Sequence, residues 1–252
     1  EIKTAVVTGS VDFAVTGITA ALEGAAQDEP FRVLASAADG ASAIVAKAGK
    51  GIKTVPDLKG RKIGYVVGSA QDILLRLTLR DAGLDADKDV ELVKVAFSDM
   101  ANALDRGDID AFSGAETGPS DALTRGIAEL VVHPYATKMK MINIVFGSSQ
   151  ATIDKDPELV RTMVDVHAKA TDYMKDHPDE WAAGVVKAYN FPAQSLALAL
   201  KNIQLRWAVD DAYIAQTRVL GEQLELLKQI KKQPDYKAFF NTDFVTPLMK
   251  AR

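Results

Sequence analysis

Gly68, Ser69, Ala70 and Gln71 separate an apolar run from an amphipathic one, an order that predicts a strand ending where a helix begins. The first backbone N–H groups of a helix have no partner within the helix, and the helix dipole adds positive potential there. Such a helix start binds anions readily, and Ser69 and Gln71 would add a hydroxyl and an amide. In the alternative interpretation, Ser69 is only an N-cap and Asp72 completes a capping box.

A second stretch, "VDFAVTGIT", has the same order of residue types near the start of the chain. Thr16, Gly17 and Thr19 would direct hydroxyl and N–H groups from a second helix start toward the same ligand. Plain helix capping is the alternative for these residues as well. A third candidate is Ala38-Asp39-Gly40, which stands between two apolar runs. Its small residues would let a ligand approach the backbone, whereas an ordinary Asp-Gly turn is the alternative.

Other kinds of site are not supported by the sequence. The chain has no cysteine, which excludes disulfides, thiol nucleophiles and thiolate metal sites. His133, His167 and His177 are scattered, and their spacing suggests neither a metal site nor a Ser-His-Asp arrangement. No GxGxxG motif or P-loop is present. We therefore expect no cofactor, no metal and no catalytic residue.

Composition narrows the class of protein. Hydrophobic residues make up 48% and charged residues 25% of the 252 residues, as in an ordinary folded protein with a sizeable core. The net charge of −4 gives no general basic surface, so nucleic acid is not an expected partner. No apolar run approaches the roughly 18 residues of a membrane span.

The elements that must position these residues alternate through the first half of the chain. Strands are predicted over 11–15, 32–38, 41–49, 62–67, 89–96, 108–114 and 141–149, and helices lie between several of them. This alternation predicts a parallel sheet covered by helices, with a loop at 115–121. From Asp156 onward the pattern is mostly helical, with Pro157 in the first helical turn after a capping Asp156.

The chain also repeats a phrase. "AVVTGSVDFAVTG" and "ALDRGDIDAFSGAETG" share an alanine, a glycine four residues later, and an aliphatic residue before an aspartate, Asp12 or Asp110. Each copy is interpreted as a helix end, a glycine C-cap and a strand. Ligands of open α/β sheets lie beyond the carboxyl ends of the strands. Two copies therefore suggest two α/β lobes, although two βα units often share such a turn by chance.

Residues 51–96 carry a family resemblance through Asp57-Leu58-Lys59-Gly60, the strand "KIGYVV", Gly68-Ser69 and Ala82-Gly83-Leu84. Together with "ALDRGDIDAF" and "VVTGSVDFAVTG", they resemble the solute-binding proteins of ABC importers, in particular the nitrate/sulfonate/taurine-binding family. The resemblance covers residues 5 to about 180.

The resemblance implies an α/β fold of the two-lobed periplasmic binding protein kind (type II), with a ligand cleft between the lobes. Lobe 1 would comprise 1–43 and 150–252, lobe 2 would comprise 44–149, and the crossing strands would lie near 41–48 and 141–149. In this family a βαβ unit precedes the helix that "EIKTAVV" would end. By this comparison the chain lacks its N-terminal βαβ unit and signal peptide; the alternative is a shorter variant.

The function implied is capture of a small anionic solute, such as a sulfonate, nitrate or carboxylate, and delivery to an inner-membrane ABC permease. A monomer is expected, periplasmic or lipid-anchored at the cell surface. Family members often have an acidic residue before a proline near the ligand; Glu116, with Thr117, is the candidate here, although Thr117 and Gly118 separate it from Pro119. Glu116 would bind an amine or hydroxyl, or limit anion size; a solvated loop carboxylate is the alternative.

Two other classes of function remain open. An enzyme on the same fold, of the thiamine-pyrimidine or menaquinone biosynthesis kind, is the first. The thiamine-pyrimidine enzymes would need a cysteine-rich segment, which this chain lacks. The effector domain of a transcription regulator is the second, and it would come with a helix-turn-helix, which the sequence does not contain.

Overall fold

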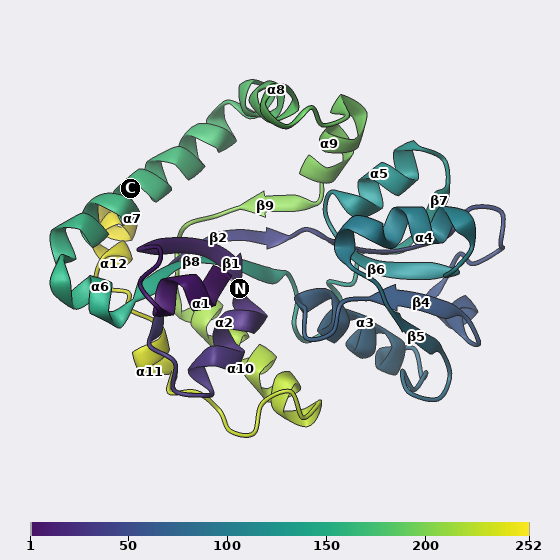
Figure 1. Ribbon diagram of the computed structural model, residues 1–252, viewed down its shortest axis with the longest axis horizontal. Helices are drawn as coiled ribbons and strands as arrows, with labels where there is room; N and C mark the ends of the chain where they lie inside the picture. Colours follow the sequence, from purple (N-terminus) through teal and green to yellow (C-terminus); the bar gives the residue numbers. More distant parts are fainter. Residues whose placement is uncertain (1, 252) are drawn as a thin grey trace. The chain divides into compact units, whose positions relative to one another are not determined.

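The computed structural model describes residues 2–251, which form two compact α/β units (Figure 1). Unit 1 comprises residues 1–39, 142–178 and 205–252, and unit 2 comprises 40–141 and 179–204. The chain thus passes between the units four times. This division differs from the predicted lobes at three places, because 142–149 belongs to unit 1, whereas 40–43 and 179–204 belong to unit 2.

Unit 1 is built on a sheet with strand order β1-β8-β2-β9. The strands are β1 (Phe13–Gly17), β2 (Phe31–Gly40), β8 (Ile142–Ser149) and β9 (Ile203–Leu205). Strand β8 pairs antiparallel with both β1 and β2, which explains why 142–149 belongs to this unit. The helices are α1 (Ile2–Val7), α2 (Ile18–Ala25), α6 (Gln150–Lys155), α7 (Pro157–Asp176), α10 (Asp211–Leu226), α11 (Tyr236–Phe239) and α12 (Val245–Ala251).

Unit 2 has a five-stranded sheet with the order β5-β4-β6-β3-β7. Its strands are β3 (Ser42–Lys47), β4 (Lys62–Tyr65), β5 (Glu91–Lys94), β6 (Ala111–Ala115) and β7 (Ala128–Val132). Its helices are α3 (Ala70–Asp81), α4 (Met100–Arg106), α5 (Gly118–Thr124), α8 (Pro178–Tyr189) and α9 (Ala193–Leu200), with 3-10 turns at Val55–Leu58 and Phe97–Asp99. Strand β4 pairs parallel with β5 and β6, as expected, but β3 runs antiparallel to β6 and β7. The predicted parallel sheet is therefore confirmed for β4, β5 and β6 and wrong for β3.

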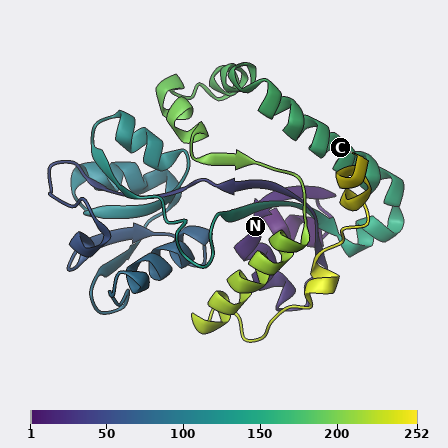
Figure 2. The ribbon, with the colours of Figure 1, turned by 180° about the vertical axis from the view of Figure 1, so that it is seen from behind.

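Both faces of the unit 2 sheet are covered, and β3 shows how the sequence achieves this. Ala43 and Val45 face a core that includes Leu104 of α4 and Ala122 of α5. Ile44 and Ala46, the alternate residues, face a second core with the leucines of α3. Figures 1 and 2 show α3 on one side of the sheet and α4 and α5 on the other. A strand buried on both faces is continuously apolar, which explains the run "SAIVA".

The repeated phrase has one copy in each unit. Asp12 directly precedes β1 in the sheet of unit 1, and Asp110 directly precedes β6 in the sheet of unit 2. In both copies the helix before the strand is followed by a glycine in the left-handed region, Gly9 (φ 75°) and Gly107 (φ 83°). The prediction that the two copies belong to different sheets is confirmed.

The loop predicted over 115–121 is in fact the start of a helix. Helix α5 begins at Gly118, and Pro119 lies in its first turn, where proline is tolerated. Strand β9 and the short helices α11 and α12 were also not predicted, because each is too short to show a hydrophobic period.

Candidate functional site

Strand directions in unit 2 bring several predicted residues to one edge of the sheet. Strands β4 and β6 are parallel, so the segments that follow Tyr65 and Ala115 leave the same edge. The first residue of the antiparallel β3, Ser42, pairs with Ala115 and lies at that edge too. Because β7 is also antiparallel to β3, the segment after Val132 leaves there as well. Ligands of α/β sheets bind at such edges.

Ser69 is the N-cap of α3. Its Oγ accepts a hydrogen bond from the Asp72 N–H at 3.1 Å and donates to the Val66 carbonyl oxygen at 2.7 Å. Asp72 in turn accepts from the Gly68 N–H at 3.0 Å and from Arg76 Nε at 2.8 Å. The single hydroxyl hydrogen of Ser69 is therefore directed at a backbone carbonyl. What this helix start offers to an anion is its backbone N–H groups and its dipole.

Gln71 is the second residue of α3 and is 3% exposed. Its Nε2 donates to Ser42 Oγ at 2.9 Å, and its backbone carbonyl accepts from Ser113 Oγ at 2.9 Å. Helix α3 is thus fixed to β3 and β6 by side-chain hydrogen bonds. Gln71 therefore helps to fix the position of the helix start, and its contact with a ligand stays a prediction.

Glu116 is partly buried and has specific partners, so the interpretation as a solvated loop carboxylate is wrong. Its Oε1 accepts from Asn202 Nδ2 at 2.9 Å, and its Oε2 accepts from the Ser120 N–H at the start of α5 at 3.3 Å. Its own N–H donates to the Ala41 carbonyl oxygen. Thr117 follows it as the N-cap position of α5 but makes no side-chain capping bond.

Asn202 and Tyr135 complete this edge of the sheet. The Asn202 amide donates to Glu116 and to the Ser42 carbonyl oxygen at 3.1 Å, and its Oδ1 lies 2.5 Å from the Tyr135 hydroxyl. The same hydroxyl accepts from the Ser42 N–H at 2.9 Å. His133 stacks on Tyr135, with 5.9 Å between ring centroids. We call Ser42, Gln71, Glu116, Tyr135 and Asn202 the edge cluster.

The electrostatics of the edge cluster are unusual for an anion site. Burial raises the pKa of Tyr135 to about 12, and the charge of Glu116 also raises it, so the phenol stays protonated at neutral pH. Among the hydrogen bonds recorded for the described residues of the cluster, none involves Lys or Arg. The cluster therefore combines neutral donors with one carboxylate.

The residues predicted in unit 1 are placed differently. Thr16 and Gly17 are the last residues of β1 and pair with Val145 and Ile144 of β8. Gly17 is the N-cap position of α2, where no side-chain capping bond is made, and Thr19 is 3% exposed inside α2. The alternative interpretation, in which a threonine hydroxyl caps this helix, is therefore wrong. Whether these residues meet a ligand stays a prediction.

Ala38 and Asp39 belong to β2 rather than to a turn, because this strand runs on to Gly40. Asp39 is 6% exposed, and its Oδ2 lies 3.3 Å from Arg206 Nη1. Burial raises the pKa of the Asp39 carboxyl, although Arg206 opposes the rise. Asp39 is thus engaged in an internal ion pair of unit 1.

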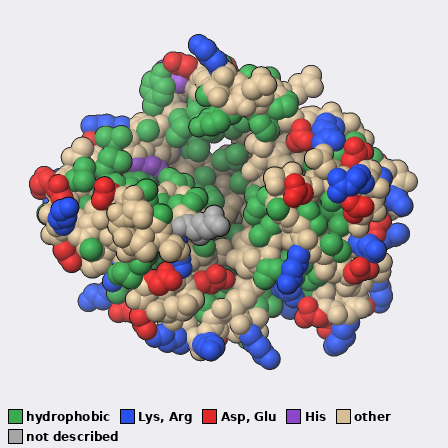
Figure 3. Space-filling model, viewed as in Figure 1, with side chains coloured by type: hydrophobic (Ala, Val, Ile, Leu, Met, Phe, Trp, Pro, Cys, Tyr) green, Lys and Arg blue, Asp and Glu red, His purple; other side chains and the backbone are tan. Residues whose placement is uncertain are grey.

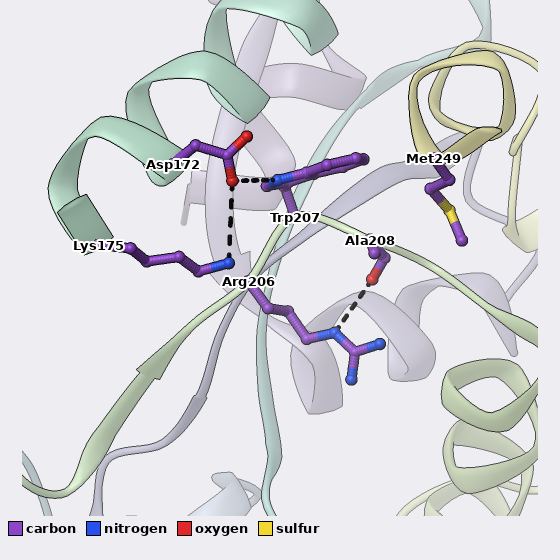
Figure 4. A pocket seen from close by; sticks show the side chains of 6 residues that line it. All are labelled: Asp172, Lys175, Arg206, Trp207, Ala208 and Met249. Atoms are coloured by element: carbon purple, nitrogen blue, oxygen red, sulfur yellow. Dashed lines mark hydrogen bonds and ion pairs between the residues drawn. The ribbon is translucent and has the colours of Figure 1, made fainter. Parts of the chain in front are cut away.

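Unit 1 also has a pocket of about 480 Å³, lined by Asp172, Lys175, Arg206, Trp207, Ala208 and Met249 (Figure 4). Asp172 accepts from Trp207 Nε1 at 2.7 Å and lies 3.9 Å from Lys175 Nζ, and Arg206 Nε donates to the Ala208 carbonyl oxygen. Charged groups of both signs line this pocket, and each already has an ionic partner, Lys175 with Asp172 and Arg206 with Asp39 and Asp210, so the pocket favours no single class of ligand.

Other site types find little support in the described part of the chain. Within residues 2–251, no group of three or more His, Asp or Glu side chains is placed to hold a metal ion. No helix in the same range is both long and apolar enough to cross a membrane. The visible surface of unit 2 mixes basic and acidic side chains (Figure 3), and pairs such as Arg106–Asp108 and Lys88–Asp85 join them.

Sequence reasoning missed Ser42, Tyr135 and Asn202. Ser42 and Tyr135 stand in apolar or turn-like stretches that carry no motif, and Asn202 is far from the rest in sequence. No local pattern links them, because strand register and the packing of α9 on α5 bring them together.

Similar proteins agree with this architecture. A binding protein of Brucella abortus is 29% identical over 155 residues, which cover 61% of this chain and 48% of that protein. A Haemophilus influenzae protein named for thiamine biosynthesis is 34% identical over 140 residues, 53% of this chain and 43% of its own. The chain thus spans about half the length of these curated relatives.

Solved structures extend the fold comparison over nearly the whole chain. The aliphatic sulphonate binding protein SsuA of Escherichia coli superposes with a TM-score of 0.81 at 20% identity, covering 94% of this chain and 81% of SsuA. The desulfurization enzyme DSZB superposes with a TM-score of 0.76 at 19% identity, covering 95% and 86%. At these identities the likeness concerns the fold, an α/β periplasmic-binding-protein fold with two sheets. The NMT1/THI5-like family model matches residues 1–181, and the chain belongs to that family.

Proposed function

We propose that this chain is the solute-binding component of an ABC import system. The observation that carries the proposal is the edge cluster of unit 2: neutral donors, a carboxylate and a helix start gathered where the strands end. It offers binding groups and contains no nucleophile–base pair. The likeness in fold to SsuA and the resemblance of the sequence to sulfonate-, nitrate- and taurine-binding proteins support it.

The chemistry of the cluster suggests the kind of solute. The N-terminus of α3 favours an oxyanion such as a sulfonate. Glu116 lies in the same cluster, and a carboxylate repels a second anion but accepts hydrogen bonds from an amine or hydroxyl. The solute that fits both is a small molecule with an anionic end and a donor end, for example taurine, which is 2-aminoethanesulfonate. Nitrate, which has no donor, fits less well.

The partners and the setting follow from this role. Delivery of the solute requires an ABC permease in the inner membrane, and the protein would work as a monomer in the periplasm or from a lipid anchor.

A titration of paired sulfonates tests the proposal. Calorimetry of 2-aminoethanesulfonate and ethanesulfonate, which differ in one amine, is carried out with the wild type, Glu116→Gln and a surface control, Glu129→Gln. We expect Glu116→Gln to weaken binding of the amine-bearing sulfonate about tenfold or more, since a hydrogen bond to a charged group contributes about 1.5–3 kcal/mol. Ethanesulfonate should bind Glu116→Gln no worse than wild type. Failure of both sulfonates to bind the wild type would contradict the proposal.

An enzyme on the same fold is the second candidate, favoured by the match to the thiamine biosynthesis protein and by the fold of DSZB. Mass spectrometry of each solute after long incubation with the protein separates the two. A transporter component returns the solute unchanged, whereas an enzyme converts it.

A further inference from the structure

His133 is the first residue after β7, and it lies beside the edge cluster. Its Nδ1 is 3.2 Å from the Ser42 carbonyl oxygen, and its ring stacks on Tyr135 with the two planes 8° apart. The Tyr135 N–H donates to the His133 carbonyl oxygen at 2.9 Å, so a tight turn at Pro134 holds the two rings side by side. The position of this imidazole is therefore fixed from two sides.

The hydrogen bonds of the Ser42 carbonyl oxygen indicate which ring nitrogen carries the hydrogen. This oxygen has two lone pairs. Three groups approach it, namely Asn202 Nδ2 at 3.1 Å, the Tyr135 hydroxyl at 2.9 Å and His133 Nδ1. The phenol has one hydrogen, which goes to the closer acceptor, Asn202 Oδ1 at 2.5 Å. The carbonyl oxygen therefore accepts from Asn202 and from His133, and the second bond requires a hydrogen on Nδ1.

The other ring nitrogen, Nε2, is then a hydrogen-bond acceptor in the neutral imidazole. Within residues 2–251, the His133 side chain makes its hydrogen bond through Nδ1, and Nε2 makes none. The residue is partly exposed. It lies at the edge of the sheet where α/β proteins bind their ligands. Nε2 is therefore available to a solute, and it accepts a hydrogen bond without carrying a charge.

Glu116 and His133 are connected through one amide. Asn202 Nδ2 donates to Glu116 Oε1 at 2.9 Å and also to the Ser42 carbonyl oxygen, which His133 binds as well. A carboxylate and an imidazole nitrogen thus belong to the same hydrogen-bonded group. Two acceptors need two hydrogens from a solute. A primary ammonium group has three hydrogens, whereas a hydroxyl group has only one.

We propose that His133 Nε2 and Glu116 together bind the donor end of the solute, and that His133 makes the site select an ammonium group over a hydroxyl group. This assignment rests on the proposed function. One N–H of the ammonium group donates to Glu116, which also attracts its charge, and a second donates to His133 Nε2. A hydroxyl group satisfies one acceptor and leaves the other unpaired, which weakens binding. The substrate class is therefore an amino sulfonate, and a hydroxy sulfonate is selected against.

Two sulfonates that differ only in this group test the assignment, 2-aminoethanesulfonate and 2-hydroxyethanesulfonate. His133→Asn is the informative variant. The asparagine amide nitrogen can take the place of Nδ1 and keep the bond to the Ser42 carbonyl oxygen, whereas Nε2 is removed. His177→Asn is the matched control, because His177 also packs on a tyrosine, Tyr173, with 4.4 Å between ring centroids, but lies at the end of α7 in unit 1.

Calorimetric titration measures both solutes with the wild type and the two variants. We expect His133→Asn to bind 2-aminoethanesulfonate about tenfold more weakly than wild type, because one hydrogen bond to a charged donor is lost. Its affinity for 2-hydroxyethanesulfonate should change much less, and His177→Asn should match wild type with both solutes. An unchanged ratio of the two affinities in His133→Asn overturns the assignment, whether both are retained or both fall equally, as they would if His133 were merely structural. If wild type binds neither sulfonate, the proposed function itself fails and the assignment falls with it.

Nitrogen NMR of the His133 ring in the wild type needs no variant and so does not depend on how the variants fold. The free protein should show a protonated Nδ1 and an unprotonated Nε2. Adding 2-aminoethanesulfonate should move the Nε2 signal further than adding 2-hydroxyethanesulfonate does. A hydrogen on Nε2 in the free protein, or an Nε2 signal that does not respond to the bound amine, overturns the assignment.

Discussion

Replacing Ser69 by aspartate tests whether the start of α3 meets the anionic end of the solute. Aspartate is as good an N-cap as serine, so the capping bond to the Asp72 N–H should persist. A negative charge at a helix N-terminus adds about 0.3–1 kcal/mol of stability. Ser69→Asp should therefore keep its helix cap and remain folded, although it loses the hydrogen bond that the Ser69 hydroxyl donates to the Val66 carbonyl.

The effect on binding is large if the anion lies at this helix start. Two like charges about 4 Å apart repel by about 4 kcal/mol at an effective dielectric constant near 20. Since about 1.4 kcal/mol corresponds to a factor of ten, the affinity should fall by roughly a thousandfold. Ser69→Asn is the matched control, because asparagine caps equally well and carries no charge.

Calorimetric titration of both variants with the cognate solute, together with thermal melts, gives the answer. Ser69→Asn should bind within a few-fold of wild type, because the Ser69 hydroxyl already donates its hydrogen to the Val66 carbonyl. Equal affinities of the aspartate and asparagine variants would exclude this helix start from the binding site and refute the reasoning.

Two further predictions concern stability. Because the pKa of Asp39 is raised in the folded state, the folded protein binds the proton of this carboxyl more tightly than the unfolded chain does. The carboxyl therefore lowers the free energy of unfolding as the pH rises above 3.8, the ordinary pKa of aspartate. As the pH rises from 4 to 8, the urea midpoint of wild type should therefore fall relative to that of Asp39→Asn. A rise relative to Asp39→Asn would mean that pairing with Arg206 outweighs the cost of burying the carboxylate. Gly40 has φ 77°, and a Cβ at this position would meet the Asn202 carbonyl oxygen at 2.5 Å. Gly40→Ala should therefore lower the free energy of unfolding by clearly more than the roughly 1 kcal/mol that replacing an ordinary left-handed glycine by alanine costs. Gly107→Ala (φ 83°) is the control, since its Cβ would meet only the flexible end of Lys47, and equal losses in the two melts would contradict the prediction.

Much of the fold could be predicted from the sequence because its signals are local. Patterns within a few residues predict the backbone conformation. Examples are the apolar stripe of 70–81, the glycine C-caps and the aspartate before each repeated strand. Strand direction could not be predicted in the same way. Strand β3 is buried on both faces, so it is continuously apolar whether it pairs parallel or antiparallel.

The same distinction between local and long-range signals applies to the residues of the candidate site. Ser69 and Glu116 were found from sequence because each follows a strand and precedes a helix, a position that a local pattern shows. Tyr135 and Asn202 were not found, because their importance comes from partners 67 to 160 residues away in the chain. Asn202 hydrogen-bonds a carboxylate, a carbonyl and a phenol, and its bond to Glu116 Oε1, with that of the Ser120 N–H to Oε2, fixes the orientation of Glu116. Under the proposed function, selection of a solute by one donor needs a carboxylate held in place, so Asn202, which holds Glu116, would matter to selectivity as much as Glu116 itself.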